Sequence, residues 1–128
     1  MKIIYKAPLT LIAGIVLGGT IIQGAHAQAK PSVPVYVVSE IDVIDEAGFK
    51  TYAAGQEVLV KKNGGKYIIR GGKVTALDGV APKRFTIYVF DSAEKMQAWK
   101  AEPGQKELMA MRDKASKVRS FAVEGMTN

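Results

Sequence analysis

The arginine within the stretch KYIIRGGKV has the clearest chemical potential of any side chain in this sequence. Arg70 follows three strand-forming residues and directly precedes Gly71 and Gly72. A guanidinium at a strand end, with the backbone N–H groups of a glycine turn beside it, can hold a carboxylate. The same arginine can instead form a structural ion pair with an acid such as Glu40 or Asp78. Both interpretations follow from the sequence.

A second arginine lies on a helical face that is otherwise apolar. Arg112 belongs to the helical stretch that is predicted after Pro103. Burying an unpaired guanidinium is very costly, so this side chain needs a partner. A ligand carboxylate can serve, and so can Glu94, Glu102 or a main-chain carbonyl of the same subunit.

Aromatic residues and one further arginine complete the candidates for binding a small molecule. Trp99 and Tyr52 are expected to fill the core between helix and sheet, and Trp99 is also a candidate for ligand contact. Tyr36 and Tyr88 would line the opposite face of the sheet if they point away from the helices. The Tyr36 hydroxyl could then act as a proton donor or a hydrogen-bond partner. Arg84, at the start of the stretch RFTIYVFDS, is the last candidate.

The rare residue types exclude several classes of chemistry. The chain has no cysteine, and its one histidine is His26. The residues after His26 contain neither histidine nor cysteine. In that part of the chain, thiolate catalysis, imidazole-based triads and His or Cys metal sites are therefore excluded. We therefore expect no metal and no cofactor, and the glycine pairs lack the spacing of a phosphate-binding loop. The lysines are scattered along the chain, so no nucleic-acid partner is expected.

The N-terminal residues have the pattern of a secretory signal peptide. Two lysines precede an apolar run at residues 9–22, and the small residues of AHA follow at residues 25–27. The run of about fourteen residues is shorter than the roughly twenty that a spanning helix needs. We expect a signal peptide at residues 1–27, a flexible lead at residues 28–33 and no stable membrane anchor after cleavage. A periplasmic or secreted location follows.

Residues 34–126 have the length and patterning of one domain. The apolar periodicity predicts a strand from Val35, a helix up to Lys61, strands at residues 66–70 and 84–90, a helix from Asp91 that is interrupted at Pro103 and Gly104, and a last strand from Val118. A small hairpin excursion with an Asp78-Gly79 turn is expected between the two middle strands. This order is the α+β ferredoxin-like βαββαβ plan, in which two helices cover one face of a four-stranded antiparallel sheet.

The first and third predicted strands are apolar on both of their alternating faces. The first strand places Val35 and Val37 on one side and Tyr36 and Val38 on the other. Two helices cover one face only, and soluble monomers rarely leave an apolar patch on the order of several hundred Å² exposed. A second copy of the chain, packed sheet to sheet, would cover it.

Several ordered motifs run through the predicted domain: YIIRGG at residues 67–72, LDG at 77–79, RFTIYVFDS at 84–92, and then Trp99, Pro103 and Arg112. With these motifs the chain resembles the bacterial family called domain of unknown function 1330, which is similar to the dimeric α/β-barrel proteins. The resemblance runs from about Val35 to Gly125. It implies a ferredoxin-like subunit, a homodimer whose two sheets close into a barrel, and a pocket between sheet and helices or inside that barrel.

The resemblance implies no single reaction. Related dimeric barrels include cofactor-free monooxygenases, isomerases, haem-handling enzymes and ligand binders. The sequence departs from the family pattern at Val89, where an acid is common, and at Lys100 and Gln105, where aromatic residues are common. If those groups make the family's pocket, this chain has fewer of them.

Two functional hypotheses remain. The first is an exported homodimer that binds a small, anionic organic molecule without changing it. The second is a cofactor-independent enzyme of the monooxygenase or isomerase kind, in which Arg70 or Arg112 orients an anionic group and Tyr36 relays a proton.

Overall fold

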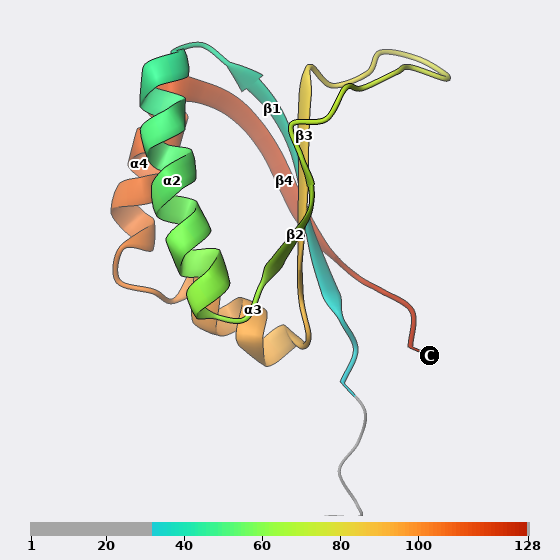
Figure 1. Ribbon diagram of the computed structural model, residues 1–128, viewed down its shortest axis with the longest axis vertical. Coiled ribbons are helices and arrows are strands. Elements are labelled where there is room, and N and C mark those ends of the chain that lie inside the picture. The colour runs from blue at the N-terminus through green and yellow to red at the C-terminus, as the bar shows by residue number, and fades with distance from the viewer. Residues whose placement is uncertain (1–31, 128) are drawn as a thin grey trace, which may run out of the picture. The chain divides into compact units, whose positions relative to one another are not determined.

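The computed structural model describes residues 32–127, and Figure 1 shows their arrangement. The predicted signal peptide at residues 1–27, and most of the predicted lead at residues 28–33, lie outside the described residues. The elements are β1 (Val35–Val43), α2 (Glu46–Lys62), β2 (Lys66–Arg70), β3 (Arg84–Phe90), α3 (Ala93–Lys100), α4 (Gln105–Ala115) and β4 (Ser116–Glu124). The βαββαβ prediction is confirmed, with the second helix divided into α3 and α4.

The four strands form one antiparallel sheet in the order β2-β3-β1-β4. The three helices of residues 32–127 lie on the same side of this sheet in Figure 1, with α2 and α4 side by side and α3 near one end. The predicted layer architecture is therefore confirmed. No helix among residues 32–127 is both long enough and apolar enough to cross a membrane.

The core between helices and sheet consists of two separate apolar clusters. One cluster gathers around the C-terminal part of α2 and contains Val37, Val60, Tyr88, Phe90 and Trp99. The other lies near the N-terminal end of α2 and contains Ile41, Phe49 and Ala115. Alternation along β1 and β3 brings these side chains to the same face of the sheet.

Small polar side chains occupy the helix-facing positions between the two clusters. Ser39 of β1 is paired with Thr86 of β3 on one side and with Ser120 of β4 on the other. The Ser39 and Ser120 hydroxyl oxygens lie 2.9 Å apart, and the Ser120 hydroxyl donates to the Val38 carbonyl at 3.1 Å. Three hydroxyl residues in a row therefore replace the large apolar side chains that would otherwise join the clusters.

The structure settles the side of Tyr88, which the sequence left open, and corrects two other details. Tyr88 points toward the helices and packs in the core, because it shares the helix-facing side of the sheet with Val37. Residues 71–83 form no hairpin strands and instead make an extended loop, which projects beyond the sheet in Figure 1. The last strand begins at Ser116, two residues earlier than predicted.

The helix-free face of the sheet is largely apolar, as the sequence predicted. Tyr36 lies on this face together with Val38, because both alternate with the helix-facing residues of β1. Further side chains on this face are exposed or half-buried and come from β2, β3 and β4, namely Ile69, Phe85, Ile87, Val89, Phe121 and Val123. The projecting loop adds Leu77 and Val80, whose side chains are 92% and 100% exposed.

Candidate functional site

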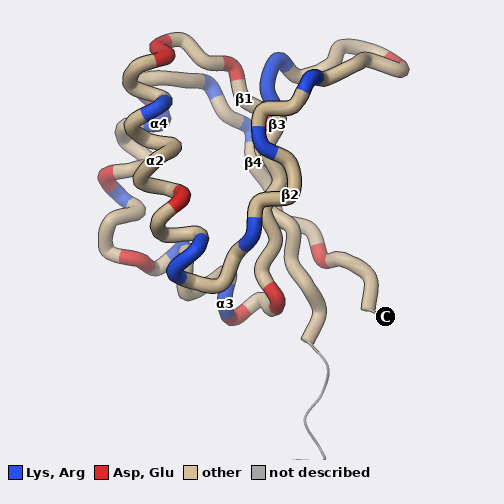
Figure 2. Tube along the Cα trace, in the orientation of Figure 1, with Lys and Arg blue, Asp and Glu red and all other residues tan. Residues whose placement is uncertain are grey.

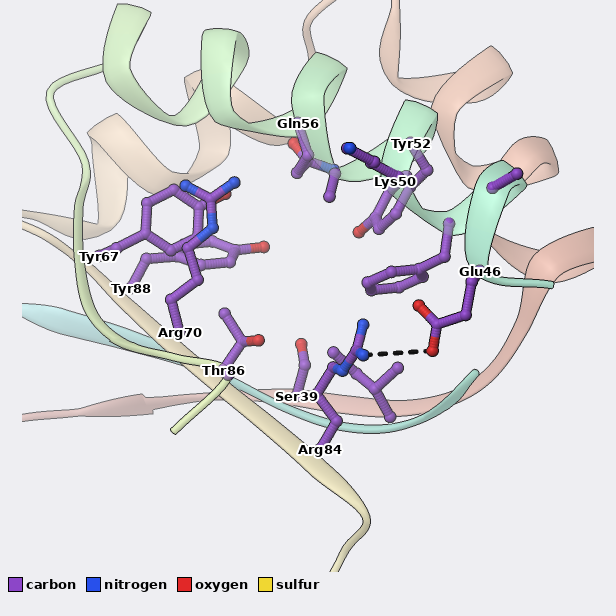
Figure 3. Close-up of a pocket in the computed structure, with 15 residues that line it drawn as sticks. Ser39, Glu46, Lys50, Tyr52, Gln56, Tyr67, Arg70, Arg84, Thr86 and Tyr88 are labelled. Carbon is purple, nitrogen blue, oxygen red and sulfur yellow. Dashed lines mark hydrogen bonds and ion pairs between the residues drawn. The ribbon is translucent and has the colours of Figure 1, made fainter. Parts of the chain in front are cut away.

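A pocket of about 490 Å³ lies between α2 and the helix-facing side of β1, β2 and β3. Figure 3 shows the side chains that line it, with Ser39 and Thr86 rising from the sheet and Tyr52 and Gln56 descending from α2. The pocket occupies the place where the small hydroxyl residues separate the two core clusters. Its volume is within the range of about 300–1,000 Å³ that is usual for small-molecule sites.

Arg70 stands at the opening of this pocket. Its Nη1 donates to Glu57 Oε2 at 2.8 Å, and its guanidinium lies 4.5 Å from the centre of the Tyr67 ring. The ion-pair interpretation therefore describes this arginine correctly, but with a partner on α2. The partners predicted for Arg70 from the sequence were wrong, since Arg70 pairs with Glu57 and Glu40 pairs with Arg119.

Arg84 lies at the opposite side of the opening. Its Nη2 is 3.4 Å from Glu46 Oε1, an interaction drawn as the dashed line in Figure 3, and its guanidinium lies 5.3 Å from the centre of the Phe49 ring. Each of the two arginines at the opening is thus held by one acid of α2 and one aromatic ring. The two pairs tie helix to sheet around the pocket without filling it.

The charge pairs also influence the protonation states of the side chains at the opening. The hydrogen bond from Arg70 holds the pKa of Glu57 below its usual value, and the hydrogen bond to Glu57 raises the pKa of Arg70. Glu57 is therefore a weak base, and both partners stay ionised across the neutral pH range. Lys50 adds an exposed ammonium group to the same opening.

Three phenols line the interior of the pocket. Burial raises the pKa of Tyr67 to about 12, and burial also raises the pKa of Tyr52 and of Tyr88. All three hydroxyl groups therefore keep their protons at neutral pH and can donate hydrogen bonds. Figure 3 shows the hydroxyl groups of Tyr52 and Tyr88 pointing toward each other across the pocket.

A buried hydrogen-bond cluster fixes the pocket's amide side chain. Gln56 Oε1 accepts from Trp99 Nε1 at 2.7 Å and from Gln105 Nε2 at 3.1 Å. Gln56 Nε2 in turn donates to Gln105 Oε1 at 3.2 Å, and Gln105 Nε2 also donates to the Trp99 carbonyl at 3.0 Å. Because Trp99 Nε1 and Gln105 Nε2 both donate to Gln56 Oε1, the orientation of the Gln56 amide is fixed, with its nitrogen toward Tyr52.

The structure brings together only part of the predicted site. Arg70, Arg84 and Gly71 line the pocket, whereas Gly72 lies exposed just outside it. Gly71 has φ +72°, so its place in the turn favours glycine, as predicted.

The other candidates lie elsewhere. Tyr36 is on the opposite face of the sheet, so the structure does not bring it together with Arg70. Arg112 pairs with Asp113 at 3.0 Å and approaches the pocket only through its interaction with Tyr52. Trp99 lines a second pocket of about 280 Å³ beside β4, and it contacts the lining of the main pocket through its hydrogen bond to Gln56 and its ring contact with Tyr88.

Sequence reasoning missed the contribution of α2 to the pocket. Phe49, Tyr52, Ala53 and Gln56 recur at spacings of three and four, which predicts one inward face of a helix but no pocket. That face is indeed turned inward, but between the clusters it meets Ser39 and Thr86, and the space left there is the pocket. Small residues at the facing sheet positions were the signal that could have located it.

No group of three or more His, Asp or Glu side chains in residues 32–127 is arranged to hold a metal ion. Figure 2 shows the lysines and arginines of the same residues spread over helices, strands and the projecting loop. The side chains that line the pocket offer phenols, guanidinium groups, hydroxyls, one amide, the Glu46 carboxylate and the Lys50 ammonium group.

A family model described as "Domain of unknown function (DUF1330)" matches residues 34–126. Among curated proteins, no sequence match was found. Solved structures with a similar fold include a protein of unknown function from Rhodopseudomonas palustris, with a TM-score of 0.63, 13% identity, and coverage of 85% of this chain and 94% of that chain.

Two further solved structures share the fold. SnoaB, a cofactor-independent oxygenase from Streptomyces nogalater, matches with a TM-score of 0.53 and 14% identity, over 76% of this chain and 97% of that chain. A hypothetical protein from Arabidopsis thaliana matches with a TM-score of 0.52 and 16% identity, over 78% of this chain and 93% of that chain. At these identities the likeness concerns the fold and not the reaction.

The Gln56 cluster generates a prediction about stability. Gln56→Leu would leave the buried Trp99 indole N–H and the Gln105 amide without their partner. We expect the free energy of unfolding to fall by about 1–3 kcal/mol, the cost of an unsatisfied buried polar group. Thermal and denaturant unfolding measure this difference. Gln97→Leu, on the exposed side of α3, is the matched control and should leave the stability nearly unchanged; equal effects of both variants would contradict the prediction.

Proposed function

The chain belongs to the DUF1330 family, and we propose that it binds a small organic anion in the pocket between α2 and the sheet. The observation that carries the proposal is the pair of arginines at the opening, each with unused donors. Arg70 gives one N–H to Glu57, and Arg84 places one nitrogen beside Glu46. A guanidinium has five N–H groups, so each retains donors for a ligand carboxylate.

The lining of the pocket suits an organic molecule better than a bare inorganic ion. Phe49 and Tyr67 contribute aromatic rings to the lining, and the hydroxyl groups of the pocket offer donors to a ligand that also carries oxygen atoms. Lys50 adds a cation that makes no ion pair with any other residue of the described part of the chain. Aromatic walls with a few polar groups at fixed positions are typical of small-molecule sites.

The anion proposal predicts a selective loss of binding. Benzoate is the probe, with benzyl alcohol as its uncharged counterpart, and isothermal titration calorimetry or NMR shift mapping measures the affinity. Arg70→Gln and Arg84→Gln should each weaken benzoate binding about tenfold or more, because a hydrogen bond to a charged group contributes about 1.5–3 kcal/mol.

The matched control for these variants is Arg119→Gln. Arg119 also pairs with a glutamate, Glu40, but on the helix-free face of the sheet. Benzoate binding that is equally weakened by all three substitutions, or benzyl alcohol that binds as well as benzoate, would be incompatible with an anion site at Arg70 and Arg84.

A cofactor-independent monooxygenase or isomerase is the alternative function. The buried phenols of the pocket favour it, because they can place protonated hydroxyl groups beside a bound molecule. The proton-relay role assigned to Tyr36 from the sequence does not suit this pocket, since Tyr36 lies on the other face of the sheet. Recovery of a chemically altered ligand after incubation with the protein would favour this alternative over plain binding.

We infer further that two copies of the chain pack sheet to sheet. The support is the apolar helix-free face, where Ile69, Phe121 and Val123 are 39%, 47% and 50% exposed. Fully burying a large aliphatic or aromatic side chain contributes about 1.5–3 kcal/mol, so a second copy gains several such contributions at once. This arrangement also leaves the pocket on the helix side of each subunit.

The dimer proposal predicts that a charge on this face weakens association. Ile69→Lys and Phe121→Lys should each raise the dimer dissociation constant about ten- to hundredfold, as burial of one apolar side chain is lost and a charge must be desolvated. Native mass spectrometry and light scattering of the chain from residue 28 measure the subunit number. Val58→Lys, at an outward position of α2 that is 64% exposed, is the control. A monomeric wild-type protein would contradict the proposal.

We propose that the protein is exported, with cleavage before Gln28 and a periplasmic or secreted location. The support is the sequence of residues 1–27, with its basic start, apolar run and small residues before the expected cleavage site. Intact mass and N-terminal sequencing of the protein from its own host should find Gln28 as the first residue. A chain that keeps residues 1–27 in the cell interior would contradict export.

A further inference from the structure

One buried hydroxyl in the pocket has no partner within the described part of the chain. Tyr88 is only 5% exposed, and its side chain lines the pocket. No group in residues 32–127 forms a hydrogen bond with its hydroxyl, although Ser39, Gln56 and Thr86 line the same pocket. Figure 3 shows this hydroxyl directed into the pocket rather than into the apolar core.

A buried hydroxyl without a partner is costly, and native structures rarely keep one without a reason. Apolar packing alone does not explain a tyrosine here, because phenylalanine would provide the same ring without the polar atom. The ring itself is firmly held, with centroid distances of 5.2 Å to Tyr67, 5.3 Å to Trp99 and 6.0 Å to Phe90. The hydroxyl is therefore a donor in a fixed position, aimed at the space that a ligand would occupy.

Tyr52 offers a second donor from the opposite wall. Burial raises the pKa of Tyr52, whereas hydrogen bonding from Gln56 and from Arg112 acts in the other direction. The Tyr52 hydroxyl lines the same pocket and points toward that of Tyr88 in Figure 3, so it can donate its proton to a ligand oxygen placed between the two rings.

The geometry points to a two-donor site, in which the hydroxyl groups of Tyr88 and Tyr52 bind one acceptor oxygen of the ligand. This inference rests on the proposed small-molecule site and deepens it by naming the ligand class. The ligand is a cyclic or aromatic organic anion with a carboxylate or similar group toward the arginines and a phenolate, enolate or carbonyl oxygen between the tyrosines.

The protonation states of the tyrosines in the pocket agree with the two-donor site. Tyr67 has a pKa of about 12 and the pKa of Tyr88 is raised by burial, so these phenols remain neutral donors well above neutral pH. Two fixed donors that converge on one oxygen favour its negatively charged form, as in an oxyanion site. The site should therefore select a phenolate over the corresponding phenol.

The test uses 4-nitrophenol, whose neutral and ionised forms differ in absorbance, so that the pKa of the bound probe can be titrated. On the wild-type protein the pKa of the bound probe should lie below that of the free probe, because the two donors stabilise the phenolate. Tyr88→Phe should bring that pKa back toward the free value and weaken phenolate binding about tenfold or more. Tyr52→Phe should act in the same direction.

The matched control is Tyr36→Phe, the same chemical change on the other face of the sheet, which should leave the probe's pKa unaltered. Tyr88→Phe keeps the ring that packs on Trp99, and a thermal melt checks that it remains folded. An unshifted pKa of the bound probe, or a shift that survives both pocket variants, would overturn the tyrosine site.

Benzoate separates this inference from the proposal on which it rests. Benzoate has a carboxylate and no phenolic oxygen, so the loss of its binding in Arg70→Gln and Arg84→Gln tests the arginines separately from the pKa shift of 4-nitrophenol. If benzoate binds through Arg70 while 4-nitrophenol shows no shift, the anion site stands and the tyrosine pair is refuted. If neither probe binds, the small-molecule site and the tyrosine pair are refuted together.

Discussion

The row of small hydroxyl residues across the middle of the sheet is the feature on which the pocket depends. Thr86, Ser39 and Ser120 are neighbours on three adjacent strands and face the helices. Large aliphatic side chains at these positions would unite the two core clusters and close the space beneath α2. Close packing is the default of protein interiors, so a pocket of about 490 Å³ with several polar side chains in its lining departs from that default and supports the proposed site.

The two clusters hold the helix at a distance from these small residues. At one end of α2, Val60 packs against Phe90 and Trp99, and at the other end Phe49 packs with Ile41. Between them, the helix is fixed by the Gln56 hydrogen bonds and by ion pairs at the opening. The pocket is therefore preformed, with donors whose positions are set by the packing on both sides.

The sequence predicts the element order because strand and helix periods differ, and the confirmed βαββαβ plan needs little more than that difference. It could not decide which apolar face of β1 and β3 the helices cover, since both faces carry large apolar residues. For that reason the sequence left open the side of the sheet on which Tyr88 lies, and the structure places it in the core. The sequence also could not predict that Arg70 pairs with Glu57, because this contact depends on how α2 is rotated and shifted over the sheet. Local sequence patterns do not determine the position of a helix over a sheet.

The acid and base strengths in the pocket bear on the choice between binding and catalysis. A reaction that begins with proton abstraction needs a base with a pKa near the working pH. Glu57 is made a weaker base by its hydrogen bond from Arg70, and the phenols are kept protonated by burial. The phenols and cations of the pocket are hydrogen-bond donors, which supports the proposed anion site. The fold shared with SnoaB does not alter this balance, because the chemistry of a site is set by its residues and not by the fold that carries them.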